Sequence, residues 1–128
     1  MENLFEKFNC GTLLLPKTTK SFENLEWNKH PTFEGVELKH IITANDTNGE
    51  LSYHLVRIAP NKKIGNHVHT DQLETHEVIQ GSGVCINEGI ELEYSIGTIS
   101  IMKKGMPHEV IAGDDGLLLF AKFIPALC

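Results

Sequence analysis

The sequence has little positive charge. Eleven of its 128 residues are basic, and ten of these are lysines, so Arg57 is the only arginine. Seventeen acidic residues leave a formal net charge of −6. Proteins that bind nucleic acid or an anionic membrane surface need a concentration of basic side chains. We therefore expect neither nucleic acid nor a membrane as a partner.

Long apolar runs and paired cysteines are also missing. No stretch approaches the roughly 20 apolar residues that a membrane-spanning helix requires, and the opening MENLFEKFNC shows no apolar segment of a secretory signal. The three cysteines, Cys10, Cys85 and Cys128, form no CxxC pair. This argues against a disulfide framework and favours a reducing compartment, so the expected location is the cytoplasm.

From residue 35 onward no segment keeps a helical period, and short β-like stretches alternate with turn residues instead. About eight strands with turn signals every eight to twelve residues indicate an all-β sandwich or barrel. Within it we expect a hairpin with a three-residue turn at NEG (87–89) and a tight turn at GDDG (113–116). The division expected is an irregular N-terminal arm over residues 1–34, packed on the barrel or on a partner subunit, and a β-barrel domain over residues 35–128.

The stretch GNHVHTDQLETHE (65–77) holds three of the seven histidines together with two glutamates. On a strand, His67 and His69 share one face, whereas on a helix they would point apart. Glu74 follows after a turn's length, and His76 lies on the same face of the next strand as Glu74. An HxH pair alone is a weak signal, but HxHxxxxE favours a metal site to which a fourth donor comes from elsewhere.

That donor is found in GTISIMKKGMPHEV (97–110), which places His108 at the start of a strand. The two stretches resemble the two sequence motifs of the cupin superfamily. The first motif is matched by His67, His69, Glu74 and Gly81, and the second by Gly97, Gly105 and His108. The chain departs from the motifs at Asn61, Lys103 and Ala112, where the family has Gly, Pro and Asn.

The resemblance, which spans about residues 50–125, implies an RmlC-like cupin: a double-stranded β-helix, or jelly-roll barrel, with a metal ion inside one end. It implies His67, His69, Glu74 and His108 as ligands of one divalent transition metal ion. Imidazole and carboxylate donors suit Mn, Fe, Co, Ni, Cu and Zn alike, and the sequence does not distinguish among them. Similar single-domain cupins include dioxygenases, isomerases, decarboxylases and lyases.

The function expected is therefore that of a metalloenzyme acting on a small polar, oxygen-rich or anionic substrate bound at the metal. A cupin that binds or senses a small ligand without turnover is the alternative, and a metal that only braces the barrel is a third possibility. Because cupins are frequently dimers and open sheet edges invite pairing, we also expect a homodimer.

Three further residues are candidates for roles beside the metal. His76 is the candidate general acid or base, because an imidazole titrates near neutral pH; the alternative is that it supports a ligand. Arg57 and Tyr53, which share a strand face, are candidates for substrate binding through the guanidinium and the phenol. Glu77, on the opposite face from Glu74, is the ligand instead if the turn before it differs from this scheme.

Overall fold

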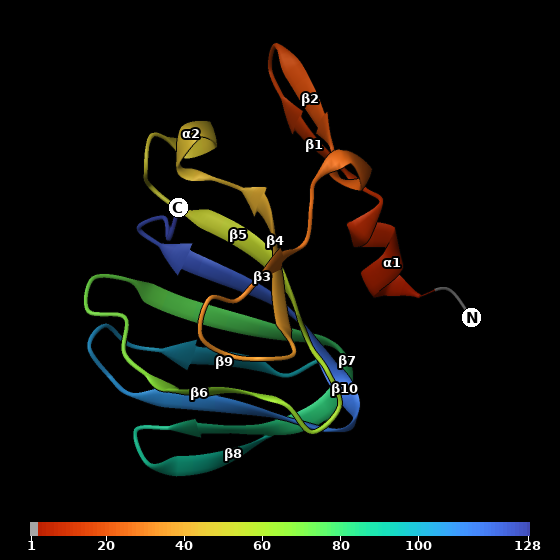
Figure 1. Ribbon diagram of the computed structural model, residues 1–128. Coiled ribbons are helices and arrows are strands. Elements are labelled where there is room, and N and C mark those ends of the chain that lie inside the picture. Colours follow the sequence, from red (N-terminus) through yellow and green to blue (C-terminus); the bar gives the residue numbers. More distant parts are fainter. Residues whose placement is uncertain (1–2) are drawn as a thin grey trace.

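The structure is a computed structural model that describes residues 3–128. Its body is a β-barrel of two facing layers, and an N-terminal arm extends along one side (Figure 1). The body contains the short helix α2 (Ala44–Thr47). Its strands are β3 (Asn28–Lys29), β4 (Val36–Ile42), β5 (Ser52–Ile58), β6 (Lys63–His67), β7 (Leu73–Asn87), β8 (Ile90–Tyr94), β9 (Ile99–Met102) and β10 (His108–Ile124).

The two longest strands, β7 and β10, pair antiparallel along most of their length and pass through both layers. The second half of β10 pairs with β5, and the first half of β7 pairs with β9. The first half of β10 pairs with β6, and the second half of β7 pairs with β8. This antiparallel arrangement confirms the all-β jelly roll expected from the sequence.

Both long strands bend where one layer passes into the other. Gly81 of β7 and Gly116 of β10 have φ values of 85° and 79°, a region that favours glycine. They also lie so close that a Cβ on Gly81 would stand 2.2 Å from the carbonyl oxygen of Gly116. Gly81 pairs with Leu117, the residue after Gly116, so the two glycines lie side by side and allow the paired strands to bend together.

Two local expectations were wrong, and one short helix was not expected. The GDDG segment (113–116) is a register shift inside the continuous strand β10, not a turn between two strands. The β7–β8 hairpin has the two-residue turn Glu88–Gly89, with positive φ at both residues and Asn87 paired to Ile90. Residues 44–47 form the one-turn helix α2, which starts at Thr43 with a capping box closed by Asp46.

The interior of the barrel is filled by apolar side chains on the inward faces of the strands, including Val56, Val78, Val110, Leu119 and Phe123. Burial alternates in the first half of β10, as a strand with one face inward requires, and the alternation breaks at Leu55 and Phe120, which the arm covers from outside. Apolar packing occupies the middle of the barrel, so polar side chains that point inward gather toward one end.

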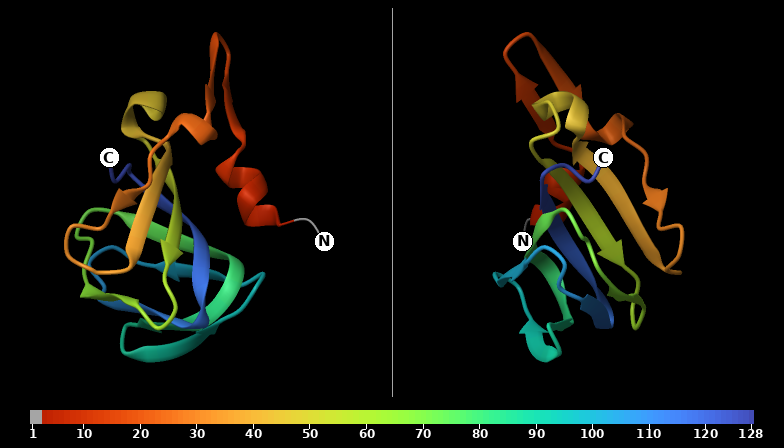
Figure 2. Two further views of the ribbon diagram at one scale, coloured as in Figure 1. Left: turned by 45° about the vertical axis from the view of Figure 1, so that its right-hand side comes forward. Right: turned by 90° about the vertical axis from the view of Figure 1, so that its left-hand side faces the viewer.

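The arm consists of α1 (Leu4–Asn9), the hairpin of β1 (Thr12–Leu15) and β2 (Thr18–Ser21), and the 3-10 helix η1 (Phe22–Asn24). The hairpin stands away from the barrel, whereas α1 runs beside it (Figure 2). Phe5 and Phe22 of the arm are buried against Leu55 and Phe120 on the outer face of β5 and β10. The arm thus covers a face of the sheet that would otherwise expose apolar side chains.

In the described part of the chain no helix is long and apolar enough to span a membrane. Cys10, Cys85 and Cys128 are free thiols.

Candidate metal centre

Four side chains meet at one end of the barrel interior. His67 ends β6, His69 lies in the loop that follows, Glu74 is the second residue of β7, and His108 begins β10 opposite His67. One ligand atom from each side chain can be chosen so that all four lie within 4.8 Å of one another. His69 reaches the cluster from a loop, not from the strand that the HxH spacing predicted.

Hydrogen bonds set which nitrogen of two of these rings faces the cluster. The Nδ1–H of His67 donates to the carbonyl oxygen of Gly65 at 2.8 Å, and the Nδ1–H of His108 donates to that of Met106 at 3.2 Å. The Nε2 atoms therefore carry the lone pairs. Metal-binding histidines are commonly oriented in this way, with the second ring nitrogen donating to a backbone carbonyl.

Two buried polar atoms of the cluster, Oε1 of Glu74 and Nε2 of His108, have no hydrogen-bond partner among the described residues. They lie 3.0 Å apart, and Oε1 also lies 3.5 Å from Nε2 of His69. Buried polar atoms are nearly always hydrogen-bonded, whereas these two face each other at ion-pair distance without hydrogen-bond geometry, as two ligands of one cation do. A divalent cation fits these donors, because imidazole nitrogen and carboxylate oxygen are ordinary ligands of transition metals.

The charge state of Glu74 suits a cation. Burial alone would raise the pKa of Glu74, but the neighbouring rings of His76 and His108 outweigh it and hold that pKa well below its usual range. The carboxylate is therefore anionic at neutral pH. For His67 and His69, burial is the largest effect and lowers the pKa of each ring, so both remain neutral and able to coordinate.

His76 lies directly behind Glu74 and is buried. Its Nε2 is 2.6 Å from Oε2 of Glu74, and its Nδ1 is 2.9 Å from the hydroxyl of Tyr94, which is also buried. Both ring nitrogens are thus engaged, and the ring fixes the orientation of the carboxylate. Tyr94 was missed by sequence reasoning, because a tyrosine in the pattern IELEY carries no signal of what its hydroxyl contacts.

The other candidates from the sequence lie on outer faces. Glu77 points away from the cluster and pairs with Lys122. Arg57 stacks on the ring of Trp27, 4.0 Å from its centroid, and its Nε donates to Glu37 at 3.0 Å. Tyr53 packs against Phe120 under the arm. The structure therefore does not bring Arg57 or Tyr53 to the histidine cluster.

A small cavity of about 60 Å³ adjoins the cluster. Its walls are largely apolar, with polar groups supplied by the cluster, His76 and His30. The Nδ1 of His30 accepts hydrogen bonds from the backbone N–H groups of Thr32 and Phe33. His30 falls within residues 1–34, which the sequence analysis assigned to the arm. Its position after NLEWNK and before Pro31 gave no indication that it reaches the cavity.

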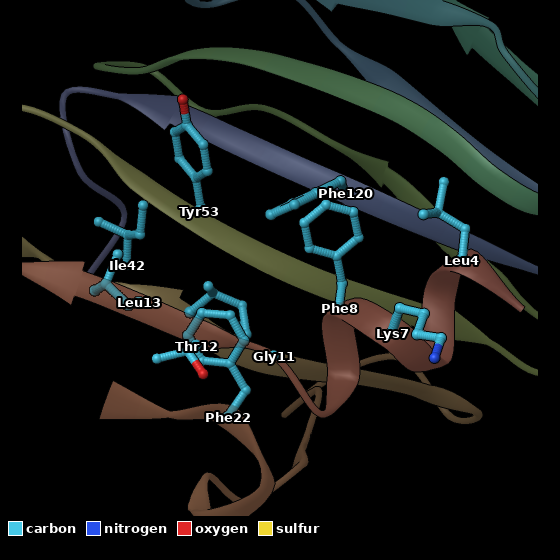
Figure 3. A pocket seen from close by; sticks show the side chains of 11 residues that line it. Leu4, Lys7, Phe8, Gly11, Thr12, Leu13, Phe22, Ile42, Tyr53 and Phe120 are labelled. Atoms are coloured by element: carbon cyan, nitrogen blue, oxygen red, sulfur yellow. The ribbon is translucent and has the colours of Figure 1, made fainter. Parts of the chain in front are cut away.

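A larger pocket of about 440 Å³ lies outside the barrel, between α1 and the outer face of β4, β5 and β10 (Figure 3). Aromatic and aliphatic side chains form most of its lining, among them Phe8, Phe22 and Phe120. None of the four clustered residues lines this pocket, so it is separate from the candidate metal centre inside the barrel.

No protein-family model and no curated protein matches the sequence. Solved structures do match. A predicted oxalate decarboxylase from Thermotoga maritima aligns with a TM-score of 0.71 and 20% identity, over 79% of this chain and 91% of that chain. An RmlC-like cupin from Shewanella frigidimarina aligns with a TM-score of 0.73 and 17% identity, over 84% and 90%. The chain has the cupin fold.

A third cupin-like neighbour is the polyketide cyclase RemF from Streptomyces resistomycificus, with a TM-score of 0.69 and 18% identity, over 80% of this chain and 75% of that chain. At this identity the likeness concerns the fold. Proteins with this fold thus include enzymes, and the present chain carries a group of three histidines and a glutamate that could hold a metal ion.

Proposed function

We propose that this cupin is a metal-dependent enzyme that acts on a small anionic compound inside the barrel. His67, His69, Glu74 and His108 would hold one divalent transition metal ion. The observation that carries the proposal is the pair of buried, unpartnered atoms, Oε1 of Glu74 and Nε2 of His108, within a group of four convergent donors.

The charge of such a centre favours an anionic ligand. Three neutral imidazoles and one carboxylate around a divalent ion leave a net charge of about +1. Four protein donors leave coordination positions open on a metal that takes five or six ligands. A bound metal would supply Lewis acidity toward a carboxylate or enolate oxygen of the substrate.

The cavity limits the size and character of the substrate. Its volume of about 60 Å³ admits only a compact molecule, and its walls include Val56, Ile64 and Phe123. A compound with one anionic oxygen group and a short apolar body matches a polar end and apolar sides. His30 is the one polar residue of the lining that is neither in the ligand group nor bonded to Glu74, and we assign it to contact with the substrate.

A second candidate function is binding of such an anion without turnover. The observation in its favour is that both ring nitrogens of His76 are engaged, by Glu74 and by Tyr94, which leaves His76 no free nitrogen for proton transfer. In an enzyme, His30 would then be the titratable group available to the substrate.

The experiment begins with the metal content of the purified protein and of the variants Glu74→Gln and His67→Ala. Glu77→Gln is the matched control, because this carboxylate lies nearby on the opposite face of β7. We expect each of the two site variants to lose one equivalent of metal with an unchanged circular dichroism spectrum, and the control to keep it. Full metal content in folded Glu74→Gln would overturn the proposal.

Turnover is tested on the metal-loaded protein with a panel of short-chain carboxylates followed by proton NMR. If product forms with the wild-type protein, is lost in Glu74→Gln and is reduced in His30→Gln, the result supports the proposal that the protein is an enzyme. If a carboxylate binds, as reported by metal-dependent line broadening, and no member of the panel is converted, the second candidate function is the correct one.

A further inference from the structure

A second group of potential metal ligands lies apart from the four described above. His40 of β4 and His54 of β5 are cross-strand partners, and their Nδ1 atoms are 2.8 Å apart. The thiol of Cys128 lies 3.7 Å from Nδ1 of His40. One ligand atom from each of the three residues lies within 4.8 Å of the others.

The segment after β10 is held so that this thiol stays beside the two rings. The N–H of Ala126 donates to the carbonyl of Gly49 at 3.0 Å, and the N–H of Leu127 donates to Oγ of Ser52 at 2.8 Å. The carbonyl of Cys128 accepts a hydrogen bond of 2.7 Å from the N–H of Ala44. The segment therefore lies against α2 and the start of β5, where Figure 1 shows the C-terminus.

One of the rings is already oriented as a ligand. Nε2 of His54 lies 2.7 Å from Oγ of Ser52. Ser52 thus holds the far side of the ring, and Nδ1 of His54 faces His40. A ring nitrogen fixed by a hydrogen bond on its far side is the usual arrangement of a metal-binding histidine.

We propose that His40, His54 and Cys128 form a second metal site, selective for a thiophilic ion such as Zn²⁺. In tetrahedral geometry, bonds of about 2.0 Å to nitrogen and 2.3 Å to sulfur place two nitrogens about 3.3 Å apart and a nitrogen and sulfur about 3.6 Å apart. The observed 3.7 Å matches the second distance, and the two nitrogens need to separate by about half an ångström from their 2.8 Å.

Proton release accompanies binding at this site. Without metal, the hydrogen on Nδ1 of His40 is shared with Nδ1 of His54, and Cys128 is a thiol whose pKa is raised by burial. Coordination through Nδ1 moves the ring proton of His40 to Nε2, and the thiol of Cys128 loses its proton, so one proton leaves for each ion bound. Burial lowers the pKa of both rings, that of His54 to about 4 with His40 contributing, so neither ring carries a positive charge against the ion.

The second site shares no ligand with the site in the barrel, but the two are near neighbours. The ring of Phe123 contacts His69, with centroids 5.1 Å apart, and also contacts His54, at 5.4 Å. His54 is buried and Cys128 is exposed, so the second site opens to solvent on the thiol side. A fourth ligand, from solvent, completes its coordination.

The thiolate gives the experiment a signal that the barrel site cannot produce. Co²⁺ bound to a thiolate absorbs in the near ultraviolet by charge transfer from sulfur, whereas Co²⁺ bound to histidine and glutamate does not. We expect this band in the metal-depleted protein titrated with Co²⁺, and equally in Glu74→Gln, which lacks the first site. Zn²⁺ is expected to displace the Co²⁺ and abolish the band.

Cys128→Ser is the test variant, and Cys10→Ser is its matched control, because Cys10 is another exposed thiol in the arm. The band is expected to vanish in the first and persist in the second, and His40→Gln is expected to weaken Co²⁺ binding at least tenfold. A band that survives in Cys128→Ser, or no band in the folded wild-type chain, would overturn the second site. Neither result bears on the barrel site, whose own test is the metal content of Glu74→Gln.

Discussion

Tyr94 is linked to the proposed metal position through His76 and Glu74. Its hydroxyl stays protonated because burial raises the pKa of Tyr94, and it lies 2.9 Å from Nδ1 of His76, which in turn lies 2.6 Å from Glu74. The ring of His76 therefore bridges the phenol and the carboxylate. Such a chain raises the electron density on the ligand and limits its rotation.

Replacing Tyr94 by Phe removes one hydroxyl and leaves the ring in the core. We expect affinity for the barrel metal to fall by about 10- to 100-fold, as is usual when the support of a ligand is lost. Competition with a fluorescent chelator measures this. Tyr53→Phe, on the outer face of β5, is the control and should leave the affinity unchanged; equal losses in both variants would contradict a role for the Tyr94 hydroxyl.

His54 makes the metal-free protein sensitive to mild acid. Its pKa falls from an ordinary 6.5 to about 4 because the ring is buried and His40 lies beside it. Below pH 6.5 the unfolded chain therefore takes up a proton that the folded chain refuses. The free energy of unfolding is expected to decrease between about pH 6.5 and 4, by on the order of 3 kcal/mol at most, and then to level off for this residue.

Urea unfolding of the chelator-treated protein at several pH values checks this prediction. In His54→Gln the free energy of unfolding should change less steeply with pH over that range. This holds even if the substitution changes the stability at pH 7. The titratable groups facing His54 are His40 from β4, Cys128 from the final segment and, at longer range, Glu74 from β7. An unchanged slope would assign the acid sensitivity to the other buried histidines.

Residue types and spacing were enough to assemble most of the candidate centre. Strand alternation predicts that Glu74 and His76 share a face and that Glu77 does not, and β7 has this arrangement. It fails for His69, because β6 ends at His67. Strand alternation does not predict that Tyr94 contacts His76 or that His30 lines the cavity. Both positions depend on how separate strands and the arm pack together.

At the scale of elements, the joint bend of β7 and β10 depends on Gly81 for two separate reasons. Its φ of 85° disfavours any other residue, and a Cβ there would meet the carbonyl oxygen of Gly116 at 2.2 Å. Gly89, in the β7–β8 turn, has a similar φ of 80° but no atom within 4 Å of an added Cβ. A comparison of substitutions at Gly89 and Gly81 therefore distinguishes the cost of backbone strain alone from the cost of strain with steric overlap.

We expect Gly89→Ala to cost about 1 kcal/mol of unfolding free energy, the cost of left-handed backbone alone. Gly81→Ala should cost about 3 kcal/mol or more, because the strand pair must also move apart. Chemical denaturation measures the unfolding free energy of each variant, and equal m-values make the two values comparable. Similar losses in both variants would show that the two strands bend without requiring this close approach.

The same bend explains why GDDG was wrongly predicted to be a turn. GDDG and GSG have the composition of chain reversals, yet residues 113–116 sit in a register shift of a 17-residue strand and GSG (81–83) lies within β7. Glycine favours positive φ at a corner in a strand as much as in a turn. Local sequence cannot tell the two apart, since the difference lies in which distant strand is hydrogen-bonded.

At the scale of the whole molecule, apolar side chains remain uncovered on one outer face. Ile99 and Ile101 on β9 are 68% and 57% exposed, and Ile99 lines a shallow depression with Leu4 and Ile96. Surface patches of this kind mark association sites. This face is where the homodimer expected from the sequence would form.

The double variant Ile99→Glu/Ile101→Glu places two charges on that face. We expect the wild-type chain to elute as a dimer in size-exclusion chromatography with light scattering, and the variant as a monomer. Ile90→Glu, equally exposed but on β8, is the control and should remain dimeric. A monomeric wild-type protein would contradict the expectation.

The order in which the ligands occur along the chain has a consequence for biosynthesis. His67, His69 and Glu74 lie on β6, the loop after it and β7, whereas His108 begins β10, whose pairing with β5, β6 and β7 joins the two layers. A nascent polypeptide on the ribosome has three of the four donors well before it has the fourth, and until β10 emerges nothing holds them together. If these four residues hold a metal ion as proposed, its capture would follow the synthesis of β10 and would be a post-translational event.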